Sequence, residues 1–192
     1  MRPLAPLVCL SLLAACAKSA DPPPAPAPAR AAPSTTTSAA SPAAPLGWTD
    51  PPGWVREPPS NPMRLAQYTL PKADGDAEAP TCVINTFGAG QGGTVDANID
   101  RWVRQFDPAS AGAVEKQRRD IHGLSVTLVE LSGTWRGMTI PGAAPAPAKP
   151  AQRMLGAIVE HPSGLHFFKL VGPDASVARA KPAFLAMLET LR

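Results

Sequence analysis

The chain has 192 residues, of which 44% are hydrophobic and 17% charged, and its formal net charge is +3. That length suits one ordinary domain with a real hydrophobic core. The charge is modest and the basic residues are scattered, which excludes the concentrated basic surface of a nucleic-acid-binding protein.

The first 15 residues have the pattern of a secretory signal peptide, with Arg2 ahead of an apolar run too short to span a bilayer. That run ends in the letters LAAC at positions 13–16, which resemble a bacterial lipobox. The resemblance implies that Cys16 becomes the first mature residue and carries acyl chains that anchor it in a membrane. Ala17 rather than Asp follows it, which resembles an outer-membrane address. The alternative is an ordinary signal peptide with an incidental cysteine.

Residues 16–46 are dominated by proline, alanine, serine and threonine, with no large apolar side chain before Leu46. Such a segment cannot bury enough surface to offset the entropy lost on ordering it. Its prolines favour the extended polyproline II conformation. We therefore expect a lipidated, disordered stalk at 16–46 that carries a single domain at 47–192.

The cysteines limit the chemistry of this domain. Cys9 would leave with the leader and Cys16 would be lipidated, so only Cys82 remains of the three. A single thiol allows neither an intramolecular disulfide nor a cysteine-based metal site. In a strand Cys82 alternates with Val83, which predicts a buried small hydrophobe rather than a reactive nucleophile.

The domain reads as about six strands, mostly antiparallel and joined locally. After a short extended piece at Trp54, strands are expected within 63–70 and 79–87, two within 112–135, and two within 153–173. His122–Gly123 and 161–164 supply the turns of the last two pairs. The basic cluster at 116–119 is interpreted as the solvated face of a strand.

Two helices are expected. The residues that fall on one face of the first are Val95, Ile99, Trp102, Val103 and Phe106. Thr94 is a suitable N-cap. A second helix ends the chain, kinked at Pro182 or beginning near Lys181. An antiparallel sheet with segregated helices is an α+β fold.

Gly88, Gly90 and Gly93 match the dinucleotide fingerprint G-x-G-x-x-G. That fold needs the motif after its first strand and repeated βαβ units, and neither condition is met here. We therefore expect no dinucleotide and interpret the glycines as a tight turn from strand into helix. Binding of an anion or partner at this helix start, through Gly90, Gly92, Gly93 and Asn98, stays open.

Several stretches together resemble a group of uncharacterised bacterial lipoproteins: MRLAQY, GAGQGGTVDANIDRWVRQF, LSGTW, RMLGAIVEHPSGLHFFKLVGP and FLAMLETL. The order of elements resembles the PsbP/Mog1-type α/β/α sandwich. PsbP-like proteins are generally non-enzymatic accessory factors and Mog1 relatives bind a protein partner, so the resemblance implies no catalytic residues. The proline- and alanine-rich insertion at 141–150 departs from a compact version of that fold.

This insertion predicts a flexible loop at 137–152. A second interpretation is an exposed polyproline segment that docks on an aromatic groove of a partner. Trp135, at its edge, either belongs to the core or anchors such contacts. Trp48 and Trp54 are expected to clamp the stalk where it enters the domain.

An enzyme would have to use the histidines. His161 and His166 flank one turn and could approach each other, and with Glu160 they would form a weak metal site. Strand alternation, however, puts Glu160 and His161 on opposite faces. No arrangement for nucleophilic catalysis is visible, so we expect neither a catalytic residue nor a metal or cofactor.

These observations predict a lipid-anchored, non-enzymatic protein of the bacterial cell envelope that binds or helps to assemble an envelope protein. Contacts are expected at Gly90, Gly92, Gly93, Asn98 and Trp135. The alternative is a periplasmic lipoprotein that binds a small ligand, an anion or a divalent metal.

Overall fold

The computed structural model describes residues 44–192 except 139–141 and 143. The predicted signal peptide, Cys16 and the stalk up to residue 43 lie outside the described residues. Leu46, placed in the stalk by its composition, is 5% exposed and belongs to the hydrophobic core. The Gly47 amide donates to the carbonyl of Arg192, and the Arg192 amide donates back to Gly47, so the two ends of the domain are paired.

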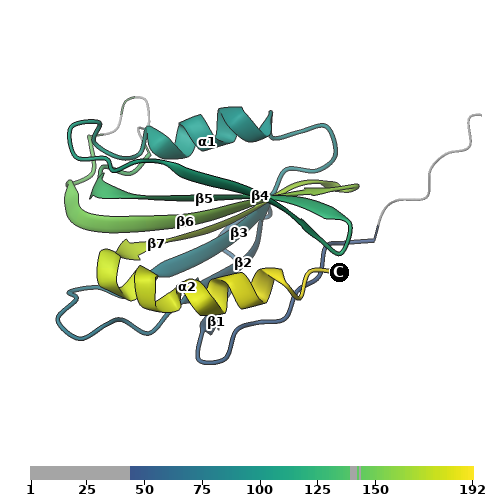
Figure 1. Ribbon diagram of the computed structural model, residues 1–192, viewed down its shortest axis with the longest axis horizontal. Helices are drawn as coiled ribbons and strands as arrows, with labels where there is room; N and C mark the ends of the chain where they lie inside the picture. The colour runs from purple at the N-terminus through teal and green to yellow at the C-terminus, as the bar shows by residue number, and fades with distance from the viewer. Residues whose placement is uncertain (1–43, 139–141, 143) are drawn as a thin grey trace, which may run out of the picture. The chain divides into compact units, whose positions relative to one another are not determined.

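A single antiparallel sheet organises the domain (Figure 1), with strands in the order β1-β2-β3-β7-β6-β5-β4. The strands are β1 (Val55–Glu57), β2 (Arg64–Thr69), β3 (Thr81–Thr86), β4 (Glu115–Ile121), β5 (Leu124–Trp135), β6 (Lys149–His161) and β7 (Gly164–Pro173). The helices are α1 (Val95–Val103) and α2 (Asp174–Leu188), which lie on opposite faces of the sheet. The expected α+β sandwich is confirmed. The described residues hold seven strands rather than six, because the extended piece after Trp54 pairs with β2 as β1.

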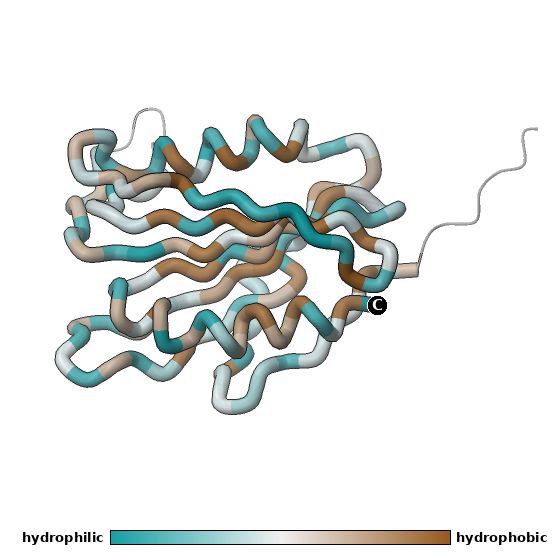
Figure 2. The backbone as a smooth tube through the Cα atoms, in the orientation of Figure 1, coloured by the Kyte–Doolittle hydropathy of each residue, from teal (hydrophilic) through white to brown (hydrophobic). Residues whose placement is uncertain are grey.

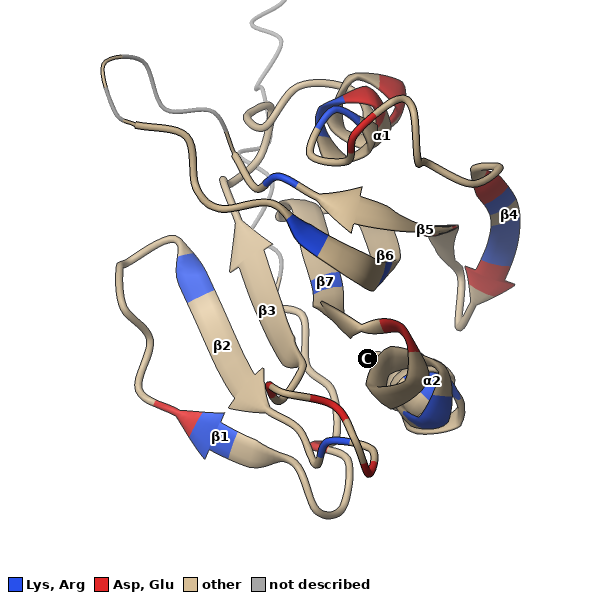
Figure 3. Cartoon of the chain, turned by 90° about the vertical axis from the view of Figure 1, so that its left-hand side faces the viewer, with Lys and Arg blue, Asp and Glu red and all other residues tan. Residues whose placement is uncertain are grey.

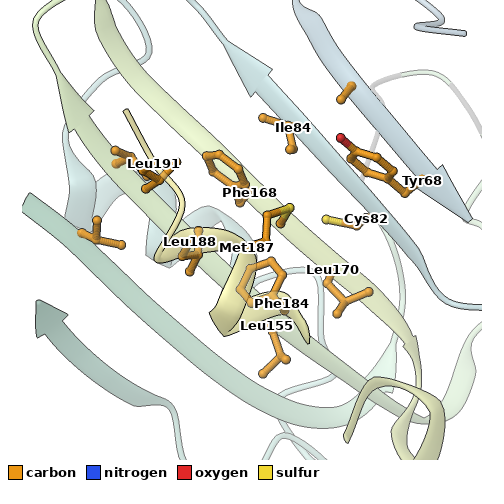
Figure 4. Packing of buried hydrophobic residues seen from close by; sticks show 14 of the residues in the cluster. Tyr68, Cys82, Ile84, Leu155, Phe168, Leu170, Phe184, Met187, Leu188 and Leu191 are labelled. Atoms are coloured by element: carbon orange, nitrogen blue, oxygen red, sulfur yellow. The ribbon is translucent and has the colours of Figure 1, made fainter. Parts of the chain in front are cut away.

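The larger core lies between the sheet and α2. Figure 4 shows Phe184, Met187 and Leu188 of α2 directed at the side chains of β3, β6 and β7. Cys82 belongs to this core and is fully buried, as predicted. Burial raises the pKa of its thiol well above the ordinary value, which makes it an unreactive part of the packing.

The smaller core lies under α1. Ile99, Trp102 and Phe106 pack against apolar side chains of β5, β6 and β7. Thr94 caps the helix as predicted, its hydroxyl accepting a hydrogen bond from the Ala97 amide at 3.2 Å. Trp102 lies so close to β6 that only a glycine, Gly156, fits beneath its ring. Figure 2 shows the hydrophobic central strands and the hydrophilic edge strand β4. Lys116 and Arg118 are exposed and Arg119 is partly exposed, which confirms that the basic cluster at 116–119 is solvated.

Two expectations about segment ends were wrong. Of the two alternatives for the last helix, a start near Lys181 is wrong, because α2 begins at Asp174 and continues through Pro182. Pro182 and Ala178, whose carbonyl loses its helical partner, are both exposed, so water can satisfy the free carbonyl. The loop expected at 137–152 ends earlier, because β6 begins at Lys149.

The entry of the chain is held by aromatic side chains, as expected. Trp48 packs edge-on against Phe168 at 5.4 Å, and Trp54 packs against Tyr68 at 5.7 Å. The Trp48 indole donates to the Tyr68 hydroxyl at 2.9 Å, and that hydroxyl donates to Asp50 at 2.5 Å. The segment is therefore fixed to the sheet through both stacking and hydrogen bonds.

We expect Tyr68 to ionise at about pH 12, because burial and the hydrogen bond to Asp50 raise its pKa from 10.0. The stability that this phenol contributes is fully present below pH 10 and is lost as pH rises towards 12. Tyr68 is the only tyrosine in the chain, so ultraviolet absorbance of phenolate reports on it alone. Asp50→Asn should lower the midpoint. A wild-type midpoint near 10, with circular dichroism still native, would contradict the expectation.

Candidate functional site

The α1 side of the sheet is only partly covered. Helix α1 packs over β5 and its neighbours, whereas within the described chain no helix lies over β1–β3 on that side (Figure 3). Gln67 and Thr69 of β2 both donate to the carboxylate of Glu57, Gln67 at 2.7 Å. The β2 part of this face is therefore polar, and Glu57 joins two of its side chains. Arg64 donates to Gln67 through Nη1, whereas its buried Nε has no hydrogen-bond partner among the described residues.

A pocket of about 270 Å³ lies where the open half meets the covered half. Its walls come from β3, β5, β6, β7 and the segment before β3, and the lining residues are Glu78, Ala79, Thr81, Val83, Trp135, Lys149, Gln152, Lys169, Val171 and Gly172. We name it the Trp135–Lys169 pocket. It combines an aromatic ring, aliphatic side chains and a small number of polar groups, the composition typical of ligand sites.

Lys169 is the unusual residue of this pocket. It lies opposite Val83 in β3 and Gly156 in β6, in the middle of the sheet. Its ammonium nitrogen lies 4.6 Å from the centroid of the Trp135 ring and donates a hydrogen bond to the side-chain oxygen of Gln105. Burial lowers its pKa to about 7. Lys169 is therefore a half-buried cation held by an aromatic face and a neutral amide.

Trp135 is positioned by the end of α1 and by a β-bulge. Its ring packs edge-on against Phe106 at 5.3 Å, and the Arg136 amide donates to the Gln105 carbonyl at 2.8 Å. The register of β5 and β6 shifts just before Trp135, where β6 holds one extra residue, and Ala151 has a φ of +50°. A bulge of this kind redirects neighbouring side chains, and here it pairs Trp135 with Lys149 rather than Pro150.

The remaining charges of the pocket are paired. Lys149 contacts the Glu78 carboxylate at 2.5 Å. Gln152 is 6% exposed and donates to the Pro150 carbonyl at 3.3 Å. Lys169 therefore carries the one charge of the pocket lining that no described carboxylate balances.

The glycine turn lies elsewhere, at the opposite end of β6. Gly88, Gly90, Gly92 and Gly93 all have φ values between +71° and +89°, which suits the structural interpretation. The Asn98 amide donates to the carbonyls of Gly92 and Thr94, both at 2.7 Å, and holds the turn onto α1. The structure thus separates Trp135 from the four predicted residues at the helix start, and their binding of a ligand stays a prediction.

The histidine hairpin meets this glycine turn. The Gly164 backbone lies against that of Gly88, and the rings of His161 and His166 are 5.4 Å apart, so the histidines approach each other as expected. His166 is buried and its Nδ1 donates to the Gly164 carbonyl at 3.0 Å. Glu160 instead pairs with Arg118, at 3.1 Å. In the described part of the chain, no group of three or more His, Cys, Asp or Glu side chains is placed to hold a metal ion.

The sequence interpretation named Trp135 but missed Lys169 and Gln105. The signal for Lys169 was a single charge in LHFFKLVGP, a strand that is apolar on both faces. A lysine in such a strand has to find a partner or a cavity. Gln105 and the bulge at Ala151 gave no such signal.

No protein-family model matches the chain, and no curated protein matches it in sequence. Among solved structures it is similar to PA94 of Pseudomonas aeruginosa, a protein of unknown function, with 14% identity over 66% of this chain and 80% of that one and a TM-score of 0.44. It is also similar to cyanobacterial PsbP (CyanoP) from Synechocystis sp. PCC 6803, with 12% identity over 77% and 91% and a TM-score of 0.45. Neither helix of the described residues is long and apolar enough to cross a membrane.

Proposed function

We propose that the chain is a non-enzymatic envelope lipoprotein, anchored through Cys16, whose domain binds a partner over the open half of its sheet and the Trp135–Lys169 pocket. The observation that carries this proposal is Lys169, a half-buried cation at a pocket wall with no carboxylate partner among the described residues. A negatively charged group of a partner would stabilise the charged form of a lysine in such a position and so gain binding energy there.

The architecture supports binding rather than catalysis. The buried thiol of Cys82 is unreactive and lies on the other face of the sheet. His161 and His166 lie beyond Lys169 towards the turn between β6 and β7, and neither lines its pocket. An aromatic ring beside a cation is a common centre of binding energy at protein interfaces. The alternative, a small-ligand lipoprotein, would use the same pocket without the open half of the sheet.

An in-cell crosslink and pull-down of the intact lipoprotein tests the proposal. We expect an envelope protein to be recovered with the wild type, to fall at least about fivefold with Trp135→Ala, as the loss of a central aromatic contact implies, and to be lost with Cys16→Ala. The matched control is Phe87→Ala, which removes an aromatic side chain, 39% exposed, beside the glycine turn. If Trp135→Ala still recovers the partner and Phe87→Ala does not, the partner binds at the glycine turn and not at the Trp135–Lys169 pocket. Equal recovery with all variants would refute the proposal.

A further inference from the structure

Lys169 differs from two other half-buried cations of the described residues, which have carboxylate partners. Arg153 contacts Glu130 and Asp174, and Lys181 contacts Glu130, as the exposed Lys149 contacts Glu78. Half-buried Arg64, which donates to Gln67, also has no carboxylate partner among the described residues, but it is not part of the pocket lining. Among the described residues no carboxylate lies within ion-pair distance of Lys169. An ammonium has three donors, and the Gln105 oxygen takes one of them.

We propose that the Trp135–Lys169 pocket, on which the proposed function also rests, is a carboxylate-binding site in which Lys169 is the counter-ion. A carboxylate in the pocket would accept the free donors of Lys169 and replace the water lost on burial with a charge-assisted hydrogen bond. The ring of Trp135 and the aliphatic side chains of Val83 and Val171 would hold the apolar body that carries the carboxylate.

The charges of the pocket favour a monoanion over a phosphate. The lining holds two lysines and one glutamate, and Lys149 is already neutralised by Glu78. One uncompensated positive charge therefore remains. Lys169 would balance only one of the two negative charges of a phosphate dianion, and the second charge would repel the Glu78 carboxylate. Both effects disfavour phosphate binding. The volume of about 270 Å³ suits a small acid or one acidic side chain of a larger partner.

Binding should take up a proton. Free Lys169 titrates at about 7, and a bound carboxylate stabilises its charged form. Two other charged groups face Lys169, namely Glu78 and Lys149, and these pair with each other. The residues that β3, β5 and the segment after α1 place around Lys169 carry no charge: Thr81, Val83, Trp135 and Gln105. We therefore expect affinity for a carboxylate to fall roughly 30-fold from pH 6 to pH 8.5.

The probe is phenylacetate, compared with the neutral phenylacetamide, and binding is followed by NMR of the Trp135 indole in the intact chain in detergent. We expect phenylacetate to shift the Trp135 resonance in a saturable, pH-dependent way and phenylacetamide to bind at least about tenfold more weakly, the loss expected of one charge-assisted contact. Lys169→Met should abolish the difference between the two probes. It keeps the apolar stem and removes the cost of burying an ammonium, so the fold is retained. Lys169→Arg should keep binding and lose the pH dependence, because guanidinium stays charged.

Lys181→Met is the matched control, since it removes a half-buried lysine that contacts Glu130 outside this pocket, and it should bind phenylacetate as the wild type does. Equal affinity for the acid and the amide, or unchanged binding in Lys169→Met, would overturn the proposal. So would the absence of any shift at Trp135 with phenylacetate. These outcomes are independent of the pull-down, which reports a protein partner whether or not a carboxylate mediates the contact.

Two peptides distinguish the sources of the carboxylate. One ends in phenylalanine with a free carboxyl terminus, and the other is amidated at its end and carries an internal glutamate. Preference for the first assigns the pocket to a chain terminus or a small acid. Preference for the second assigns it to an acidic side chain of a folded partner. If neither peptide binds better than an amidated peptide without glutamate, the carboxylate assignment is wrong.

Discussion

Gly164→Ala is expected to destabilise the domain by about 3 kcal/mol or more, because two independent costs add at this position. Gly164 has a φ of +119°, which an alanine adopts only under strain. An added Cβ would also lie 2.3 Å from the Gly88 carbonyl oxygen and 2.8 Å from the Ala89 amide nitrogen. These atoms belong to the backbone of the glycine turn, so the hairpin and the turn would have to separate.

Gly123→Ala is the matched control, since Gly123 is also a turn glycine with φ of +80° and nothing lies within 4 Å of its added Cβ. Only the strain of a left-handed backbone conformation should affect this variant, so its free energy of unfolding should fall by about 1 kcal/mol. Urea unfolding of the two variants gives the difference, and the melting temperature of Gly164→Ala should fall by roughly 10 °C. If both variants lose the same free energy of unfolding, the backbone of Gly164 does not lie in close contact with the backbone of Gly88 and Ala89 as the structure indicates.

The helix expected from Val95 to Phe106 was found with the predicted cap and start, although it ends at Val103, because one signal determined it. The apolar side chains recur with the helical period, the cap precedes them, and the same side chains fill the smaller core. Local preference and tertiary packing agree at this helix, so sequence alone sufficed.

The sequence left the start of helix α2 open, and tertiary contacts decide it against the local preference of Pro182. Pro182 favours a helix end, yet the first turn is fixed to the sheet by Arg153, which contacts Asp174 at 2.9 Å. The Ser176 hydroxyl also donates to Asp76 at 2.5 Å. Partners about 20 and 100 residues away in the sequence cannot be inferred from the helix itself.

The candidate pocket was only partly visible for the same reason. Trp135 was identifiable as an aromatic beside a proline-rich segment, but Lys169 becomes informative only when its surroundings are known. Its contacts with Gln105 and Trp135 join residues 64 and 34 positions apart. The sequence also grouped Trp135 with the glycine turn as contacts, whereas they lie at opposite ends of β6.

Gly156→Ala is the second variant with a large expected effect, about 1–3 kcal/mol, the usual cost of overfilling a core. An added Cβ would lie 2.2 Å from Cζ3 of Trp102 and 2.8 Å from its Cε3. Trp102 is 6% exposed and also packs edge-on against Phe167, so its ring cannot swing into solvent without lifting α1 from the sheet. The fluorescence of the variant should report a more exposed tryptophan.

A double variant isolates the cause. Trp102→Phe alone leaves a cavity and destabilises the domain, but in the Gly156→Ala background the new methyl group fills part of that space. The double variant should therefore lose at least about 1 kcal/mol less free energy of unfolding than the two single variants lose together. Gly112→Ala is the control, because its added Cβ meets Ser132 at an ordinary 3.5 Å, and it should change stability little.

Strict additivity of the two changes would show that contact with Trp102 is not what requires glycine at position 156. Coupling of the expected sign would instead show that the contact between Trp102 and Gly156 helps to set the distance of α1 from the sheet. The segment after α1 carries Gln105 and Phe106, which contact Lys169 and Trp135, so that distance also affects the position of two residues of the Trp135–Lys169 pocket.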